Sequence, residues 1–265
     1  MRLAASNIGW TAEQDDRVLS CMAEEGFTGL ELAPTRLFPE RPYEHLREAA
    51  EYAAELRRRY GLSICSLQSI WYGQTQRIAE SEESRRRLLS YTEQAIRFAD
   101  ALGCRNLVFG CPRNRSIDRP EDAELVEQFL WQCGEAAKPF GVVVALEPNP
   151  PIYQTNFINT TAEAIKLLQK LGHPALKLNL DFGTVIENGE SLGWISQHGE
   201  LINHVHISEP RLAPIRDREA HRDLLRQLEE IGYKGFVSIE MGSQELQILP
   251  AIRYLGELGR ALHRR

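Results

Sequence analysis

The sequence predicts an α/β protein that folds as a single-domain (β/α)8 barrel (TIM barrel). Eight apolar, strand-like segments alternate with eight helical segments, at about one pair per 30 residues. Such alternation indicates a parallel sheet, and 265 residues agree with the length of about 250 that is typical of this barrel. An open, doubly wound sheet is the alternative. It is disfavoured because no strand is followed by a G-x-G-x-x-G or phosphate-loop motif.

The predicted strands are short apolar runs, several of which end in a polar side chain. The best defined is V-V-V-A-L-E-P-N-P-P at residues 142–151, where a continuous apolar segment leads into Glu147. A run of this kind is typical of a strand that is buried on both faces. Pro148, Pro150 and Pro151 then prevent further pairing. The eight predicted strands are residues 3–10, 29–34, 62–71, 106–111, 142–151, 176–181, 202–208 and 235–241.

The predicted helices lie between and after these strands and carry start and stop signals. Thr11 with Gln14 three residues later matches a capping box, and Gly26 follows the first helix. Ser81 precedes two glutamates whose charges complement the dipole of the third helix. The predicted helices are residues 11–25, 43–60, 81–102, 120–140, 160–171, a shorter one within 191–198, 222–231 and 243–263, the last with a kink expected at Pro250.

Composition restricts the class of protein and its partners. The chain is 43% hydrophobic and 26% charged, as expected of a globular protein, and its net charge of −6 argues against binding nucleic acid or an anionic membrane. Its five cysteines are scattered without a C-x-x-C motif, which suits free thiols in a reducing compartment. We find no signal peptide and no run of membrane-spanning length. We therefore expect a cytoplasmic protein with a small-molecule substrate and no membrane partner, and leave a homo-oligomer open.

The last four predicted strands each end in a potential metal ligand. In a barrel of this kind the chemistry lies at the carboxyl ends of the strands. Because alternate residues of a strand share a face, we expect Asp181, His206 and Glu240 to point inward, as Glu147 does after the fifth strand. The four side chains should therefore converge at one mouth of the barrel.

Three carboxylates in a confined space repel each other and rise in pKa unless a cation neutralises them. Three oxygen donors with one imidazole suit Mn²⁺, Mg²⁺ or Co²⁺ better than a metal that prefers thiolates. Each residue taken alone could also be an ordinary polar side chain at a strand end. Together they predict one divalent metal ion, with Mn²⁺ as the first choice.

Four motifs resemble the metal-binding strand ends of the xylose isomerase-like sugar phosphate isomerase/epimerase superfamily. They are L-E-P-N-P, L-N-L-D-F-G, H-V-H-I-S-E and V-S-I-E-M. This superfamily includes ketose 3-epimerases, hydroxypyruvate isomerase, inosose dehydratase and, more distantly, endonuclease IV. The resemblance implies that residues 1–265 form one such domain and that Glu147, Asp181, His206 and Glu240 hold one divalent metal. It also implies that, as in the epimerases, Glu147 and Glu240 exchange the substrate proton.

We therefore expect a metal-dependent isomerase or epimerase of a sugar or sugar phosphate. It would remove a proton next to a carbonyl and form an enediolate that the metal holds. A carboxylate on each side of the substrate could take the proton from one face and return it on the other. A lyase or dehydratase that acts on a keto-polyol with the same site is the alternative. A nuclease like endonuclease IV would need further histidines and a basic surface, and a non-catalytic metal-binding barrel is the remaining alternative.

The sequence departs from the epimerase pattern near the substrate. Thr184 stands where a substrate-contacting histidine is common in that family, which makes Thr184 a candidate substrate-binding residue. No second glutamate follows Glu147 in N-P-P-I-Y. Arg211 lies near the place of a substrate-binding arginine in that family. Glu31 could hydrogen-bond a sugar hydroxyl or brace a neighbouring strand. Trp71 could form an apolar wall under a sugar or pack in the core.

Three further polar residues are weaker candidates for the functional site. The loop G-C-P-R-N-R contains Arg113 and Arg115, which could bind a phosphate or carboxylate, although an exposed basic loop is the favoured interpretation. His204 lies one layer below His206, and we expect a supporting or core histidine there rather than a ligand.

Overall fold

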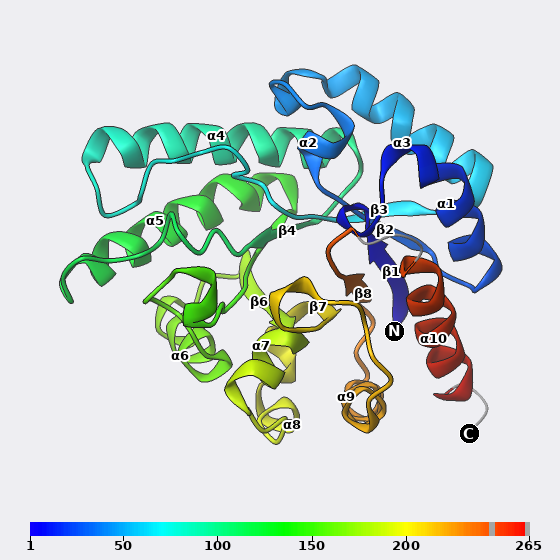
Figure 1. The fold of residues 1–265 in the computed structure, drawn as a ribbon. Helices are drawn as coiled ribbons and strands as arrows, with labels where there is room; N and C mark the ends of the chain where they lie inside the picture. The colour runs from blue at the N-terminus through cyan, green and yellow to red at the C-terminus, as the bar shows by residue number, and fades with distance from the viewer. Residues whose placement is uncertain (244–246, 263–265) are drawn as a thin grey trace.

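Eight parallel strands close into a barrel that a ring of helices surrounds (Figure 1). The computed structural model describes residues 1–243 and 247–262. Strand order follows chain order, and the last strand pairs with the first, so the predicted (β/α)8 barrel is confirmed. The strands are β1 (Arg2–Ser6), β2 (Gly29–Leu32), β3 (Ser63–Leu67), β4 (Asn106–Phe109), β5 (Val143–Leu146), β6 (Leu176–Asp181), β7 (Ile202–Ser208) and β8 (Phe236–Glu240).

The helices cover the outside of the barrel, and α10 packs beside α1 and β1 to complete the ring (Figure 1). The α-helices are α1 (Asp15–Glu24), α2 (Pro34–Leu37), α3 (Leu46–Tyr60), α4 (Glu82–Ala101), α5 (Asp122–Ala137), α6 (Thr161–Leu171), α7 (Phe182–Asn188), α8 (Ile195–His198), α9 (Glu219–Glu230) and α10 (Ile248–Leu262). Local signals explain several of their ends. Ser81 accepts a hydrogen bond from the Ser84 N–H at the start of α4, and Gly172 ends α6 in the left-handed region at φ 58°.

Five of the predicted strands, the first to the fifth, run two or more residues too far at their carboxyl ends. After β1 the chain forms a short 3-10 helix at Asn7–Gly9, and Pro34 begins α2. Ser69 after β3 and Cys111 after β4 have positive φ values of 52° and 43°, which turn the chain out of the extended conformation. These turns lead into the loops that surround the carboxyl mouth of the barrel.

The helices after β6 and β8 differ from those predicted. Helix α7 begins directly after Asp181 and was not predicted, while the predicted helix within residues 191–198 is only the short α8. Pro250 lies in the first turn of α10, where a proline removes no intrahelical hydrogen bond. Residues 244–246 and 263 of the predicted final helix lie outside the described residues.

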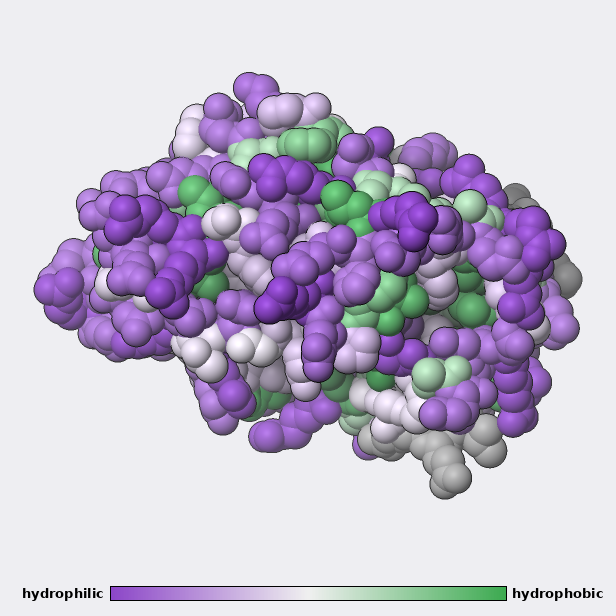
Figure 2. All heavy atoms as spheres, turned by 90° about the horizontal axis from the view of Figure 1, so that it is seen from above, coloured by the Kyte–Doolittle hydropathy of each residue, from purple (hydrophilic) through white to green (hydrophobic). Residues whose placement is uncertain are grey.

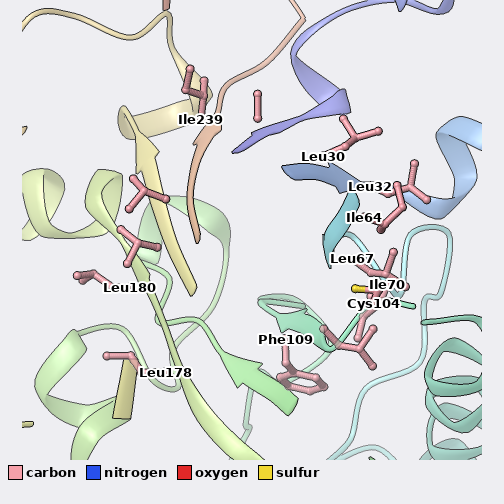
Figure 3. Close-up of a cluster of buried hydrophobic side chains, with 14 of the residues drawn as sticks. Leu30, Leu32, Ile64, Leu67, Ile70, Cys104, Phe109, Leu178, Leu180 and Ile239 are labelled. Atoms are coloured by element: carbon pink, nitrogen blue, oxygen red, sulfur yellow. The ribbon is translucent and has the colours of Figure 1, made fainter. Parts of the chain in front are cut away.

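The main core lies between the barrel and its helices. On β6 the residues Leu178 and Leu180 are fully buried and belong to this core, whereas Asn179 between them contacts a side chain of the barrel interior. Figure 3 shows both leucines together with buried side chains from other strands, such as Phe109 of β4 and Ile239 of β8. This alternation is the one that the sequence predicts for β6, and it places Asp181 on the inner face.

The molecule has a largely polar exterior on the face shown in Figure 2. The face in Figure 2 is largely hydrophilic, and its hydrophobic residues lie in small, scattered groups. Within residues 1–243 and 247–262, no helix has both the length and the apolar character needed to cross a membrane. The five cysteines are free, as the sequence predicts.

His221 on α9 should make the fold sensitive to acid. Its ring packs against Phe182, and its Nδ1 lies 3.1 Å from the Tyr254 hydroxyl. Burial lowers the pKa of His221 to about 4 from an ordinary value of 6.5, because the charged ring loses hydration. The stability that the neutral ring contributes is therefore complete above pH 6.5 and is lost as the pH falls towards 4.

We expect this residue alone to lower the free energy of unfolding by about 2 kcal/mol between pH 7.5 and pH 5. Urea unfolding of the wild type and of His221→Gln at both pH values measures the difference. The variant should lose less stability over this interval than the wild type does. Equal losses in the two proteins would show that His221 is not the acid-sensitive group.

Candidate metal centre

Glu147, Asp181, His206 and Glu240 lie together at the carboxyl mouth of the barrel. One potential ligand atom of each lies within 4.8 Å of those of the others, and all four residues are buried. The Nδ1 atom of His206 is 3.0 Å from Glu147 Oε1 and 3.2 Å from Glu240 Oε2. The structure therefore brings together the four residues that the strand ends predicted.

Strand pairing places Asp181 and His206 at the same level, and Glu240 two residues further towards the carboxyl end. Asp181 on β6 is level with His206 on β7, and Ser208 on β7 is level with Glu240 on β8. Glu147 directly follows β5, and its N–H still donates to the Phe109 carbonyl at 3.0 Å. The proline after Glu147 has no N–H to continue this ladder, so the chain leaves the barrel here.

Two amides hold the Glu147 carboxylate. Asn179 on β6 donates from Nδ2 to Oε1 at 2.6 Å, and Asn149 donates from Nδ2 to Oε2 at 2.9 Å. Gly110 leaves room for this carboxylate, since a Cβ at that position would lie 2.8 Å from Glu147 Oε2. The orientation of Glu147 is therefore fixed by its neighbours before any ligand binds.

Asp181 is held by the start of α7 and by β7. Its Oδ1 accepts a hydrogen bond from the Thr184 N–H at 2.6 Å, and its Oδ2 accepts one from the Ser208 hydroxyl. The carboxylate thus caps the helix that follows it, which also explains why α7 begins at Phe182. The Thr184 hydroxyl donates to the Pro148 carbonyl at 3.0 Å.

Glu31 orients His206 from below. Its Oε1 lies 3.0 Å from His206 Nε2, and its two oxygens also accept hydrogen bonds from Ser66 and Ser238 at 2.8 and 2.9 Å. Burial favours the neutral acid, but the neighbouring imidazoles of His206 and His204 hold the pKa of Glu31 well below its usual range. An ionised Glu31 keeps the proton on His206 Nε2 and directs Nδ1 towards the other three candidate ligands.

His204 occupies the layer below His206, as predicted. The two rings are nearly perpendicular, with centroids 5.2 Å apart. His204 Nε2 is 3.3 Å from Glu31 Oε1 but has no hydrogen bond of good geometry among the described residues. We therefore regard its contact with Glu31 as weaker than that of His206.

The pKa values of the four residues reflect crowded negative charge. Burial raises the pKa of Glu240 to about 7, and burial together with the Glu147 charge raises the pKa of Asp181. Burial opposes ionisation of Glu147 too, but its hydrogen bond and charge interaction with His206 lower its pKa. Burial disfavours the charged His206 ring, yet Glu31 and Glu240 raise its pKa well above the usual value. Charge of this density suits a cation, and the donor set of three carboxylates and one imidazole fits a hard divalent ion.

A cavity of about 300 Å³ opens above these residues. Glu147, Asp181 and Glu240 line it together with polar and aromatic residues of the surrounding loops. Trp71 lines it as well, while its Nε1 donates to Thr92 Oγ1 at 2.9 Å and its ring meets Phe109 edge-on. Trp71 is thus both a cavity wall and a part of the core.

The other three predicted substrate residues do not line the part of the cavity that the structure describes. Glu31 is fully buried below His206, and Thr184 is fully buried against the backbone of Pro148. Arg211 is exposed, and its backbone N–H donates to the Tyr153 hydroxyl at 2.9 Å. For Glu31 this geometry favours the bracing role over a contact with sugar.

Arg115 does not belong to an exposed basic loop, which corrects the favoured interpretation of that segment. Its side chain is fully buried and donates to four backbone carbonyls. These belong to Gly110, Glu147, Phe157 and Ile158. Asn149 and Asn179 are further site residues that the sequence analysis did not identify, although strand alternation places Asn179 on the inner face.

Comparison with known proteins gives the family. The family model described as xylose isomerase-like TIM barrel matches residues 20–258. A putative hydroxypyruvate isomerase of Homo sapiens is 35% identical over 162 residues, which is 56% of this chain and 57% of that protein. A ketose 3-epimerase of Arthrobacter globiformis is 30% identical over 129 residues, which is 48% of this chain and 44% of that protein. The matched segments thus span about half the length of these curated relatives.

Solved structures share the fold over nearly the whole chain. The apo form of a 3-keto-D-glucoside 4-epimerase from E. coli has a TM-score of 0.76 at 22% identity and covers 98% of this chain and 99% of its own. D-psicose 3-epimerase from Clostridium cellulolyticum H10, solved with D-tagatose, has a TM-score of 0.79 at 18% identity with the same coverage of 98% and 99%. The chain therefore belongs to the xylose isomerase-like TIM barrel family.

Proposed function

We propose that this protein is a divalent-metal-dependent isomerase or epimerase of a sugar, sugar phosphate or related keto-polyol. The observation that supports this most directly is the buried group of Glu147, Asp181, His206 and Glu240, whose ligand atoms lie within 4.8 Å of one another beside a cavity. The names of the curated relatives, a putative hydroxypyruvate isomerase and a ketose 3-epimerase, support the reaction class. The free cysteines suit the reducing cytoplasm, where we place the enzyme.

We propose that the same four residues hold one divalent ion. Glu147, Asp181 and Glu240 would supply oxygen atoms and His206 would supply Nδ1, a set that suits Mn²⁺ and also Mg²⁺ or Co²⁺. When bound, such an ion would polarise the substrate carbonyl and offset negative charge that develops beside it. Asn179, Ser208 and Glu31 would keep the ligands in place through the hydrogen bonds described above.

Glu147 and Glu240 are the proposed acid and base. They approach the cavity from different strands, β5 and β8, and both line it. A substrate between them could lose a proton to one carboxylate and regain a proton from the other. This would invert the configuration of the carbon that lies between the two carboxylates. If the proton returns instead to the neighbouring carbon, the same two residues produce an isomer.

A solvent-exchange experiment tests this function. The Mn²⁺-loaded protein is incubated in D₂O with hydroxypyruvate or with a ketohexose. Proton NMR follows the signal of the hydrogens on the carbon next to the carbonyl. We expect deuterium at that carbon as turnover proceeds. If both compounds turned over without deuterium exchange, the reaction would be a hydride shift or a hydrolysis, and the proposal would be contradicted. A dehydratase would instead release a product that lacks one water.

Replacing Glu31 by Gln should weaken metal binding without touching a ligand. The amide is a weaker acceptor than the carboxylate and no longer fixes the proton on His206 Nε2, so we expect Mn²⁺ affinity to fall about 10- to 100-fold. Calorimetric titration with Mn²⁺ measures this directly. Ser238→Ala is the matched control, because it removes only one hydrogen bond to Glu31 and should have a smaller effect. Unchanged Mn²⁺ affinity in Glu31→Gln would show that Glu31 does not position the histidine.

A further inference from the structure

We propose that the substrate carries an anionic group, a carboxylate or a phosphate, which Arg113 binds at the rim of the cavity. This inference rests on the proposed function, because it concerns the same cavity. It narrows the substrate to hydroxy-keto acids or ketose phosphates and assigns a role to a loop that contributes none of the four proposed metal ligands.

The loop between β4 and α5 holds Arg113 in place through its neighbours. Arg115 is fully buried, and its guanidinium donates to the carbonyls of Glu147, Phe157 and Ile158 at 2.9–3.1 Å. Asn114 is also buried, and its Nδ2 donates to the carbonyls of Gln76 and Gln74 in the loop between β3 and α4, at 2.7 and 3.0 Å. Arg113 itself is exposed and lines the cavity. The loop is therefore fixed on one side of Arg113 and presents its side chain to the ligand space.

The charge of the cavity lining indicates why an anionic substrate would need Arg113. Three carboxylates line the cavity, and Arg113 is the one cationic side chain among the described residues that do so. A divalent ion offsets two of those three charges, so an anionic substrate would still meet net negative charge without Arg113. In the part of the chain that the structure describes, Arg113 forms no salt bridge with an acidic side chain, which leaves its planar donors available for a carboxylate or phosphate.

Asn149 is independent evidence for a ligand that contains a hydroxyl group. Asn149 lines the same cavity. Its Nδ2 donates to Glu147, but its buried Oδ1 has no hydrogen-bond partner among the described residues. A buried carbonyl oxygen of this kind needs a donor, and a substrate hydroxyl provides one. The cavity of about 300 Å³ is at the small end of ligand sites, so the anion and the hydroxyl belong to a compact molecule.

Arg211 is the competing arginine, and its position is less suitable. It follows β7 at the same mouth, but its side chain is exposed and is absent from the described lining of the cavity. Its backbone N–H, rather than its guanidinium, makes the contact with Tyr153. The experiment therefore compares the two arginines directly.

The test uses the Mn²⁺-loaded protein and three small hydroxy ketones: dihydroxyacetone, dihydroxyacetone phosphate and hydroxypyruvate. We measure kcat/KM for deuterium exchange and, independently of turnover, affinity by calorimetric titration. One anionic compound should exceed dihydroxyacetone by about 10- to 100-fold, the usual range for a charge-assisted hydrogen bond. The preferred anion distinguishes a carboxylate substrate from a phosphate substrate.

Arg113→Gln should lower kcat/KM and affinity for the preferred anion about 10- to 100-fold, to the level of dihydroxyacetone, while Arg113→Lys should restore part of the preference. Arg216→Gln is the control for loss of a positive charge, because Arg216 is an exposed arginine on another loop of the same mouth. Equal use of the three compounds, or loss of the preference in Arg211→Gln instead, would overturn the proposal. Failure of both anionic compounds to bind would also overturn it.

The two proposals fail in different ways. If dihydroxyacetone exchanges but no anion is preferred, the isomerase function stands and the role of Arg113 is wrong. If an anion binds in an Arg113-dependent manner but no compound exchanges deuterium, the anion site stands and the proposed function is wrong.

Discussion

Replacing Glu147 or Glu240 by Gln should lower turnover by a factor of at least about 10², the usual contribution of a general base. The amide keeps an oxygen that can bind a metal but cannot accept the substrate proton. Mn²⁺ affinity should therefore fall only modestly while kcat falls strongly. Steady-state kinetics with calorimetric titration separates the two effects.

The two variants should also differ from each other. Because each carboxylate is expected to serve one face of the substrate, each variant should first lose deuterium exchange from one of the two epimers. Glu187→Gln is the matched control, since Glu187 is an exposed residue of α7 and should leave the kinetics unchanged. Full activity in either site variant would remove that glutamate from the proton transfer and leave it at most a ligand.

Dialysis against a chelator should abolish activity and lower the melting temperature. Removal of a divalent ion leaves three buried carboxylates without a compensating charge, which disfavours the folded state. A metal at 100 times its dissociation constant contributes about 2.7 kcal/mol, and this corresponds to a shift of several degrees in a chain of this size. Activity assays and differential scanning calorimetry measure both effects.

Mn²⁺, Co²⁺ or Mg²⁺ should restore both activity and melting temperature. In Asp181→Ala, which lacks one ligand, chelation should change the melting temperature much less. A protein that metal analysis shows to be free of divalent ions, yet that retains full activity, would contradict the metal dependence proposed above.

The barrel and the direction of its inner residues could be predicted because both depend on local patterns. Alternating apolar segments identify the eight strands, and the period of two places Asp181 and His206 on the inner face. In a parallel barrel the strand ends meet at one mouth, so the proximity of these side chains follows from their positions alone. The four candidate metal ligands could be identified from the sequence for the same reason.

Contacts across the barrel and in its loops could not be predicted from local sequence patterns. The hydrogen bond between Glu31 and His206 joins residues 175 positions apart on strands that are not neighbours, and it requires the closed barrel to be known. The burial of Arg115 depends on four carbonyls from three segments of the chain. Helix α7 is hard to predict because its cap, Asp181, also has the features of a metal ligand at a strand end.

Anomalous diffraction from a crystal grown with Mn²⁺ tests the central claim most directly. We predict one strong manganese peak at the carboxyl mouth, within about 2.0–2.6 Å of an oxygen of Glu147, Asp181 and Glu240 and close to His206 Nδ1. A peak at another place, or no peak at this site at saturating Mn²⁺, would contradict the account.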